Sequence, residues 1–176
     1  MLSLSSLAGW EDAVLASIRG ATGTPDERDR QIERSGLYGE YPAIVRAYME
    51  LYADTELARE AVKRAVFLVW RGAMAPPSTT GIAALPDGTA RAVIEDLDAR
   101  VRRGETDAEL AWMLAWYVAD GAGRFVFELY GGTPRLFNFA ASSAPDAWRS
   151  AGITAAAMAQ RGQLGRYWTE LAADAR

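Results

Sequence analysis

The spacing of hydrophobic residues predicts helices in almost every segment of the chain. Near the start, side chains three or four positions apart share one helical face, at Leu7, Trp10, Val14 and Ile18. The clearest amphipathic segment runs from about Asp87 to Arg103, and Gly104 ends it. Its polar face is predicted to carry ion pairs between residues four positions apart, namely Arg91–Glu95, Asp96–Arg100 and Asp98–Arg102.

One segment, about 57–73, changes character along its length. Its first half is two-sided, with Arg59, Glu60 and Lys63 on the side that is expected to face solvent. Its second half, Ala65-Val-Phe-Leu-Val-Trp70, is apolar on every side, which is typical of a helix buried in a core. We therefore expect this helix to pass through the centre of the molecule.

A second segment, about 107–130, is also predicted to be a buried helix. Thr106 and Glu109 form a capping box at its start, and the residues that follow are apolar on nearly every side. We expect the helix to be continuous, because a strand over 124–130 would have no partner strand elsewhere in the chain. The sequence as a whole predicts an all-α fold, a single-domain helical bundle over residues 1–176 with two buried central helices.

Two other segments differ from this core pattern. The helix from Thr24 to about Arg34 is almost entirely charged, which indicates a solvated surface helix or a partly ordered arm. The segment 75–86 contains prolines and a glycine but no charged residue. It is therefore predicted to be a loop that either packs onto the core or lines a site.

The composition excludes several kinds of chemistry. The chain has no cysteine and no histidine, so thiolate nucleophiles and histidine-based catalysis are excluded. The formal net charge is −4 and the arginines are scattered among acids, which argues against nucleic-acid binding. No apolar run reaches the ~18 residues of a membrane span, and the N-terminal stretch meets Glu11 and Asp12 too early for a signal peptide. We expect a cytoplasmic protein without a cofactor, a nucleic-acid partner or a membrane partner.

Asp120 is the most unusual placement in the sequence, because it falls inside the predicted buried helix. With Arg124 four positions later, it could form a buried ligand-binding or catalytic site against the rings of Trp116 and Tyr117. The same spacing suits an internal ion pair that only joins helices, with Glu128 as a further partner. The sequence favours this structural interpretation, since no second catalytic group is evident, and no catalytic residue is assigned.

Aromatic residues form a second candidate site. Trp70, Trp112, Trp116 and Tyr117 could make an aromatic cage for a cation or a flat ligand. Aromatic residues at helical spacing inside apolar runs are nevertheless more typical of a core. We therefore expect these rings to be core residues, with the cage as the alternative.

Two polar groups complete the candidates. Ser78, Thr79 and Thr80 could cradle a phosphate, but the Gly-Lys frame of a phosphate loop is missing and no basic residue follows until Arg91. A structural crossover held by hydroxyl–backbone bonds is the favoured interpretation.

Acids between 95 and 109 could hold a cation through oxygen ligands alone. Ion pairs and helix N-terminal positions explain most of them, so no metal site is predicted.

A set of short motifs lies within residues 40–130. These are Ala65-Val66-Phe67-Leu68-Val69-Trp70, Pro77-Ser78, Thr80-Gly81-Ile82, Glu109-Leu110, Trp112-Met113-Leu114, Trp116-Tyr117 and Ala119-Asp120. They resemble the motifs of a family of uncharacterised bacterial all-helical proteins. In this chain the loop is shorter by a residue, and Gly121 and Gly123 stand where the family would have bulkier residues. The resemblance implies an all-helical fold and transfers no activity.

The sequence supports three hypotheses on function. The first is a non-catalytic bacterial interaction protein, similar to an immunity or accessory factor, because of the acidic balance and the charged segment 24–35. The alternative is a small-ligand-binding protein or enzyme that uses Asp120 and Arg124, which predicts a sizeable internal cavity opening near the 75–86 loop. The third is a homo-oligomer with a large exposed apolar patch around Tyr167 and Trp168.

Overall fold

The computed structural model of the chain describes residues 2–83 and 85–175. Met1, Ala84 and Arg176, which the predicted 1–176 domain and the predicted 75–86 loop include, lie outside the described residues. Within the described residues there are eleven α-helices, three short 3-10 helices and no strand. The predicted all-α fold is therefore confirmed, and the predicted absence of a strand over 124–130 holds with it.

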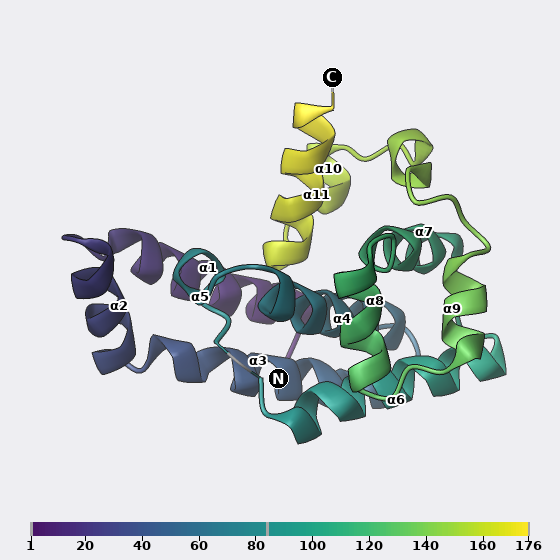
Figure 1. Cartoon of the computed structure of the whole chain (residues 1–176), viewed down its shortest axis with the longest axis horizontal. Coiled ribbons are helices and arrows are strands. Elements are labelled where there is room, and N and C mark those ends of the chain that lie inside the picture. Colours follow the sequence, from purple (N-terminus) through teal and green to yellow (C-terminus); the bar gives the residue numbers. More distant parts are fainter. Residues whose placement is uncertain (1, 84, 176) are drawn as a thin grey trace.

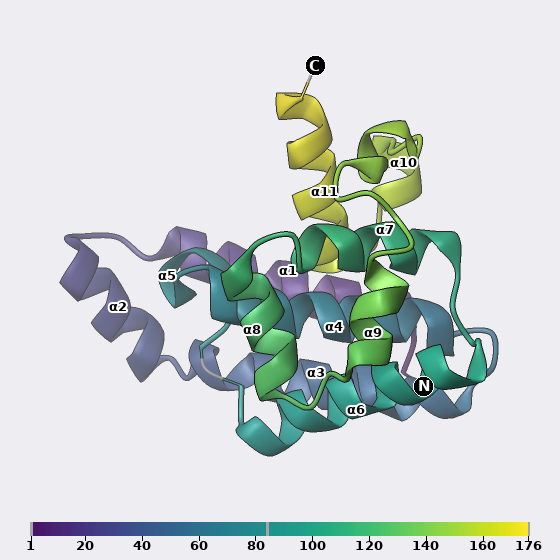
Figure 2. The same ribbon diagram turned by 45° about the vertical axis from the view of Figure 1, so that its right-hand side comes forward.

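The helices follow one another through short connections (Figures 1 and 2). In chain order they are α1 (Leu4–Gly20), α2 (Pro25–Arg34), η1 (Leu37–Gly39), α3 (Glu40–Glu50), η2 (Leu51–Ala53), α4 (Ala58–Met74), α5 (Pro77–Thr80), α6 (Asp87–Arg103), α7 (Ala108–Tyr117), α8 (Gly121–Leu129), α9 (Pro134–Ala140), η3 (Ala147–Ser150), α10 (Ala155–Met158) and α11 (Gly162–Asp174). Their buried hydrophobic residues form one core cluster.

Helix α4 lies at the centre of the fold, as its apolar second half predicts. It packs against α3, α6, α8 and α11, and in Figure 2 it runs between α7 above and α3 and α6 below. Every residue from Ala61 to Trp70 is buried. This run includes Lys63, so the prediction that Lys63 faces solvent is wrong. Its side chain is buried because its ammonium group forms ion pairs with Asp107 and Glu109.

The predicted continuous helix over 107–130 is wrong, because the chain forms two helices there. Asp107, not Thr106, is the N-cap of α7 and accepts a hydrogen bond from the Leu110 N–H at 2.8 Å. Helix α7 ends at Tyr117, and α8 begins after Asp120, whose extended backbone and side-chain bond to the Gly123 N–H make it an N-cap. Helix α7 is buried along almost its whole length, whereas α8 is buried on one face only.

Gly123 explains why the second helix starts where it does. A Cβ atom at this position would collide with the carbonyl oxygen of Tyr117, so only glycine lets the start of α8 approach the end of α7 this closely. The turn changes the direction of the chain between the two helices, as Figure 2 shows. Asp120 consequently lies at the surface and not inside a helix.

The uncharged 75–86 segment packs onto the core through Thr80, Gly81, Ile82 and Leu85, whereas residues 76–79 are exposed. It contains the short helix α5, after which Gly81 takes a left-handed conformation with φ +73°. Ile82 and Leu85 are buried beyond it. Burial of Ile82 and Leu85 explains the apolar residues in the second half of the segment.

Helices α2 and α11 extend away from this core at different ends of the molecule (Figure 1). Helix α2 begins at the predicted Thr24 capping box and buries only Ile32, which confirms a solvated surface helix. Helix α11 buries Trp168 fully, and Tyr167 is half-buried. The predicted exposed patch around Tyr167 and Trp168 is therefore wrong, because both rings belong to the aromatic core.

Candidate functional site

The predicted buried site at Asp120 and Arg124 does not form. Both residues are exposed, and Asp120 uses its carboxylate to accept the Gly123 N–H at 2.6 Å. Arg124 instead pairs with Glu128, with 2.8 Å between Nε and Oε1, and both side chains remain about half exposed. The internal ion pair that the sequence favoured is wrong for the same reason. The break between α7 and α8 turns this face towards solvent.

The aromatic residues form the core and not a cage. Trp70 and Tyr117 stack with ring centroids 4.5 Å apart, and Trp112 meets Trp168 edge-to-face at 4.6 Å. Trp116 is partly buried and donates its indole N–H to Tyr167 Oη at 2.7 Å. Each ring is in contact with other rings, so packing accounts for their positions.

The hydroxyl groups of Thr79 and Thr80 form hydrogen bonds with the backbone of the loop. Thr79 Oγ1 donates to the Pro76 carbonyl at 2.8 Å, and Thr80 Oγ1 accepts the Ile82 N–H at 3.1 Å. Thr80 is buried, whereas Ser78 and Thr79 are exposed. The structural crossover that the sequence favoured is confirmed.

The structure contains a buried polar centre that the sequence analysis missed. Glu11 of α1 is only 1% exposed. It accepts hydrogen bonds from Tyr48 Oη at 2.5 Å and from the backbone N–H of Gln163 at 2.9 Å. The side-chain amide of Gln163 in turn donates to Tyr41 Oη and to the Thr80 carbonyl. The centre thus joins α1, α3, α5 and α11.

Burial changes the pKa of the Glu11 carboxyl in this centre. Loss of solvation raises the pKa of Glu11 to about 7, although the bonds from Tyr48 and Gln163 act in the opposite direction. Gly162 at the start of α11 lies against the carboxylate, and a Cβ atom there would overlap it. Glu11 therefore fixes the N-terminus of α11 onto α1, where an acidic group is favoured by the helix dipole.

The sequence does carry a signal for Glu11. Position 11 falls on the same helical face as Leu7, Val14 and Ile18. A carboxylate on an otherwise apolar stripe predicts a buried and partnered acid. Its partners lie far along the chain, in α3 and α11, so the stripe alone does not identify them.

A second ion network holds α4, α7 and the start of α11 together. Lys63 Nζ lies 2.7 Å from Asp107 Oδ2 and 2.5 Å from Glu109 Oε2. Arg161 bridges Glu109 and Glu60 at 2.7 and 2.6 Å. Burial acts against ionisation of Glu109, but hydrogen bonds from Arg161 and Lys63 outweigh it and lower the pKa of that carboxyl. Every acid in this network has a cation, so it is a structural clamp.

Most of the acids considered for a metal site are paired with other protein groups. Asp96 pairs with Arg100 at 2.6 Å. Asp98, predicted on the outer face of its helix, is buried and accepts a hydrogen bond from the Thr133 hydroxyl at 2.5 Å. Within the described part of the chain no three potential ligand residues come together as a metal site.

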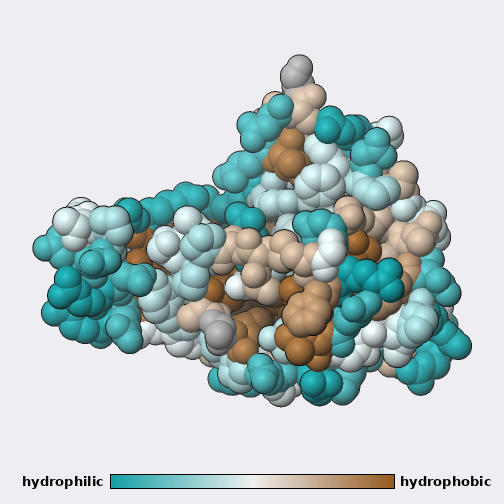
Figure 3. All heavy atoms as spheres, in the orientation of Figure 1, coloured by the Kyte–Doolittle hydropathy of each residue, from teal (hydrophilic) through white to brown (hydrophobic). Residues whose placement is uncertain are grey.

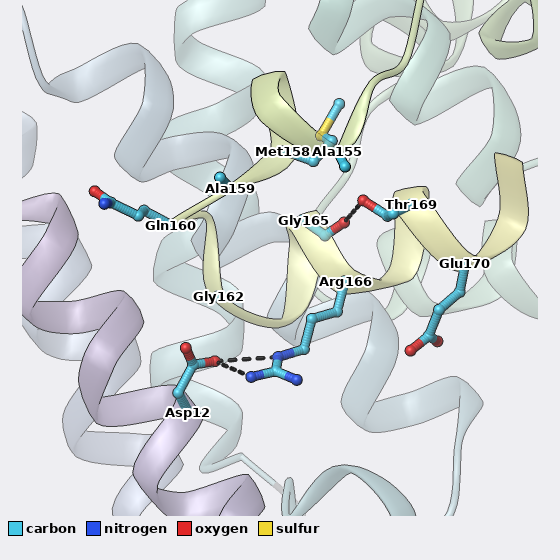
Figure 4. A pocket seen from close by; sticks show the side chains of 10 residues that line it. All are labelled: Asp12, Ala155, Met158, Ala159, Gln160, Gly162, Gly165, Arg166, Thr169 and Glu170. Atoms are coloured by element: carbon cyan, nitrogen blue, oxygen red, sulfur yellow. Dashed lines mark hydrogen bonds and ion pairs between the residues drawn. The ribbon is translucent and has the colours of Figure 1, made fainter. Parts of the chain in front are cut away.

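An open cleft of about 310 Å³ runs along α11 (Figure 4). Gly162 and Gly165 form its floor, and Arg166 pairs with Asp12 of α1 at 2.9 Å. Arg166 and Glu170 project from α11 on the same side. The cleft offers a concave surface between α1, α10 and α11, but no buried charged group faces it.

A smaller pocket of about 70 Å³ shares Arg166 and Glu170 with this cleft. Arg19 of α1, Arg71 of α4 and Thr79 of α5 contribute to its lining. A ligand-binding protein or enzyme that uses Asp120 was expected to have a sizeable cavity near the 75–86 loop. The pocket found beside this loop is far below the ~300 Å³ of an ordinary ligand site.

An exposed apolar face lies on α8. Phe125 is 60% exposed and Leu129 is 50% exposed, and the two side chains lie one helical turn apart. Ala122, also exposed, continues the same face. In Figure 3 hydrophobic atoms gather at the lower centre of the molecule, where Figure 1 places α8. We call Ala122, Phe125 and Leu129 the α8 face.

Comparisons with known proteins add no family to this description. No protein-family model, curated protein or solved structure matches the chain. The resemblance noted over residues 40–130 therefore contributes only the expectation of a helical fold. Within the described residues, none of the helices combines the length and the apolar character that a membrane crossing requires.

Proposed function

We propose that this chain is a non-catalytic interaction protein of the bacterial cytoplasm, and that it binds a separate protein through the α8 face. The observation that carries the proposal is the exposure of Phe125 and Leu129 on one side of a single helix. A scattered exposed leucine is ordinary in any protein. A large aromatic and an aliphatic side chain that share one exposed helical face are typical of an interface anchor.

The polar groups of the molecule support a non-catalytic role. The carboxylate of Glu11 and the carboxylates around Lys63 are engaged with protein groups that stabilise the packing of helices. The chain also lacks histidine and cysteine, and histidine is the most common general base in enzymes. Buried acids that are fully partnered are unsuited to proton transfer with a substrate.

The size of the α8 face favours a separate partner over a second copy of the chain. Obligate dimers bury large and strongly apolar interfaces, whereas non-obligate ones have a small apolar centre with a polar rim. Arg124 and Glu128 supply such a rim, with both charge signs beside Phe125 and Leu129. We therefore expect a partner that presents an apolar segment flanked by charges of both signs.

Site-specific photo-crosslinking in bacterial cells tests this proposal. A photoreactive residue at position 125 is expected to capture one defined protein. The same residue at Ala13, which is exposed on α1, serves as the matched control and is expected to capture no defined protein. Equal capture from both positions, or capture only of a second copy of this chain, would contradict the proposal.

A further inference from the structure

Three arginines from three helices meet at the small pocket beside α5. Arg19 comes from the last turn of α1, Arg71 from the last turn of α4, and Arg166 from the first half of α11. Thr79 also lines the pocket. The volume of about 70 Å³ leaves room for one small polyatomic ion, but not for a whole nucleotide or sugar.

The positive charge of this pocket is only partly balanced. Arg166 pairs with Asp12, with 2.9 Å between Nη2 and Oδ1. Among the described residues, no ion pair involves Arg19 or Arg71. Glu170 also lines the pocket, but its carboxylate is not within ion-pair distance of any of the three guanidinium groups. Two arginine side chains therefore remain available to an anion.

Arg71 is held in place without an acidic partner. Its guanidinium carbon lies 5.1 Å from the centroid of the Tyr167 ring. The Tyr167 hydroxyl accepts the Trp116 indole N–H at 2.7 Å, so the ring itself is fixed by the core. A planar guanidinium that rests on a fixed ring keeps its N–H groups oriented for two parallel bonds to an oxyanion.

Helix dipoles offer a simpler reason for two of these arginines. A cation in the last turn of a helix is stabilised by the negative end of the dipole, and Arg19 and Arg71 both occupy last turns. This reason does not cover Arg166, which lies near the start of its helix. It also does not explain why all three arginines line the same pocket.

We propose that this pocket binds a phosphate or sulfate group, with Arg19 and Arg71 as its principal ligands and Arg166 at its edge. The sequence argued against a phosphate site at the 78–80 hydroxyls because the Gly-Lys frame is missing and no basic residue follows until Arg91. The fold supplies the missing basic residues from α1 and α4. The proposal is independent of the α8 face, because none of these arginines belongs to that face.

Titration of the ¹⁵N-labelled protein with inorganic phosphate, followed by NMR at constant ionic strength, tests the proposal. We expect saturable shifts of the amides around Thr79 and Arg71, whereas chloride gives none, and we expect sulfate to compete. Arg19→Gln and Arg71→Gln are each expected to weaken phosphate binding at least tenfold. Arg46→Gln serves as the matched control, because it removes an exposed arginine on α3 that forms no ion pair with any described residue. We expect it to bind phosphate within twofold of the wild type.

The outcome for Arg19→Gln is decisive even if Arg71→Gln folds poorly, because Arg19 is exposed and its loss leaves the core intact. Thermal unfolding of each variant shows whether the fold is kept. Shifts that do not saturate would overturn the proposal. So would an Arg19→Gln protein that binds phosphate like the wild type, because arginines that serve only the helix dipoles change stability and not phosphate affinity.

Discussion

The buried carboxyl group of Glu11 is expected to make this protein less stable as the pH rises through neutrality. Burial raises the pKa of Glu11 from 4.5 to about 7 in the folded state. In the unfolded chain the carboxyl is solvated and titrates near its ordinary pKa of 4.5. Folding thus favours the protonated form, so this stability is fully present below about pH 4.5 and is lost as the pH rises through about 7.

The magnitude follows from the two pKa values. One pKa unit of difference corresponds to about 1.4 kcal/mol in the free energy of unfolding. The shift from 4.5 to about 7 therefore amounts to a loss of about 3 kcal/mol over the whole range. Most of this change, about 2 to 3 kcal/mol, falls between about pH 5 and 8.

Glu11→Gln isolates this contribution, because glutamine has a similar shape and stays neutral at every pH. Its amide oxygen can accept the Gln163 N–H, and its amide nitrogen can donate to Tyr48 Oη. Urea unfolding of both proteins between about pH 5 and 8 gives the difference in unfolding free energy at each pH. We expect the wild type to lose about 2 to 3 kcal/mol of unfolding free energy relative to the variant over this range.

Subtracting the unfolding free energy of Glu11→Gln from that of the wild type removes the contribution of the other acids, which are the same in both proteins. The pKa of Glu109 is lowered in the fold, and its contribution to stability is instead lost as the pH falls. Glu56→Gln, at an exposed position ahead of α4, is the matched control and should show no such trend. A wild-type minus Glu11→Gln difference that stays constant across this range, or that rises with pH, would refute the reasoning.

Three further substitutions test the core. Gly162→Ala should lower the free energy of unfolding by several kcal/mol, because its Cβ would overlap the Glu11 carboxylate and φ is +58°. Gly36→Ala is the control, with φ +73° and open space around the Cβ. It should lower the free energy of urea unfolding by only about 1 to 2 kcal/mol. Lys63→Ala leaves two half-buried carboxylates without their ammonium partner and should lower the free energy of unfolding by about 3 kcal/mol. An unchanged melting temperature would show that the ion network does not stabilise the fold. Trp112→Ala should cost about 3–5 kcal/mol by urea unfolding, and a variant as stable as the wild type would show that its ring is not part of the core.

The local periodicity of the chain predicts its helices well where one face is continuously apolar. The central helix 57–73 and the amphipathic helix 87–103 were predicted within a residue or two, because their apolar faces match the helical repeat over several turns. The prediction of one continuous helix over 107–130 failed because apolar residues continue on both sides of the break between α7 and α8. An aspartate three positions ahead of a buried glycine, as at Asp120, indicates an N-cap in the middle of such a run.

The polar centres are harder to predict, because their members come from distant parts of the chain. Lys63 was placed in solvent because its helix half looked two-sided, and its acidic partners follow only in α7. Arg19 and Arg71 share a pocket although they are far apart in sequence. Only the packing of helices from distant parts of the chain brings such residues together.

The affinity of the protein captured at position 125 tests the central claim most directly, because it measures what the α8 face contributes. A Phe125→Ser, Leu129→Ser double variant changes only exposed positions, so its stability should stay within about 1 kcal/mol of the wild type. We predict that it binds the purified partner at least tenfold more weakly. Leu2→Ser, at another exposed leucine, should bind as the wild type does. Equal affinity for the wild type and the double variant would contradict the account.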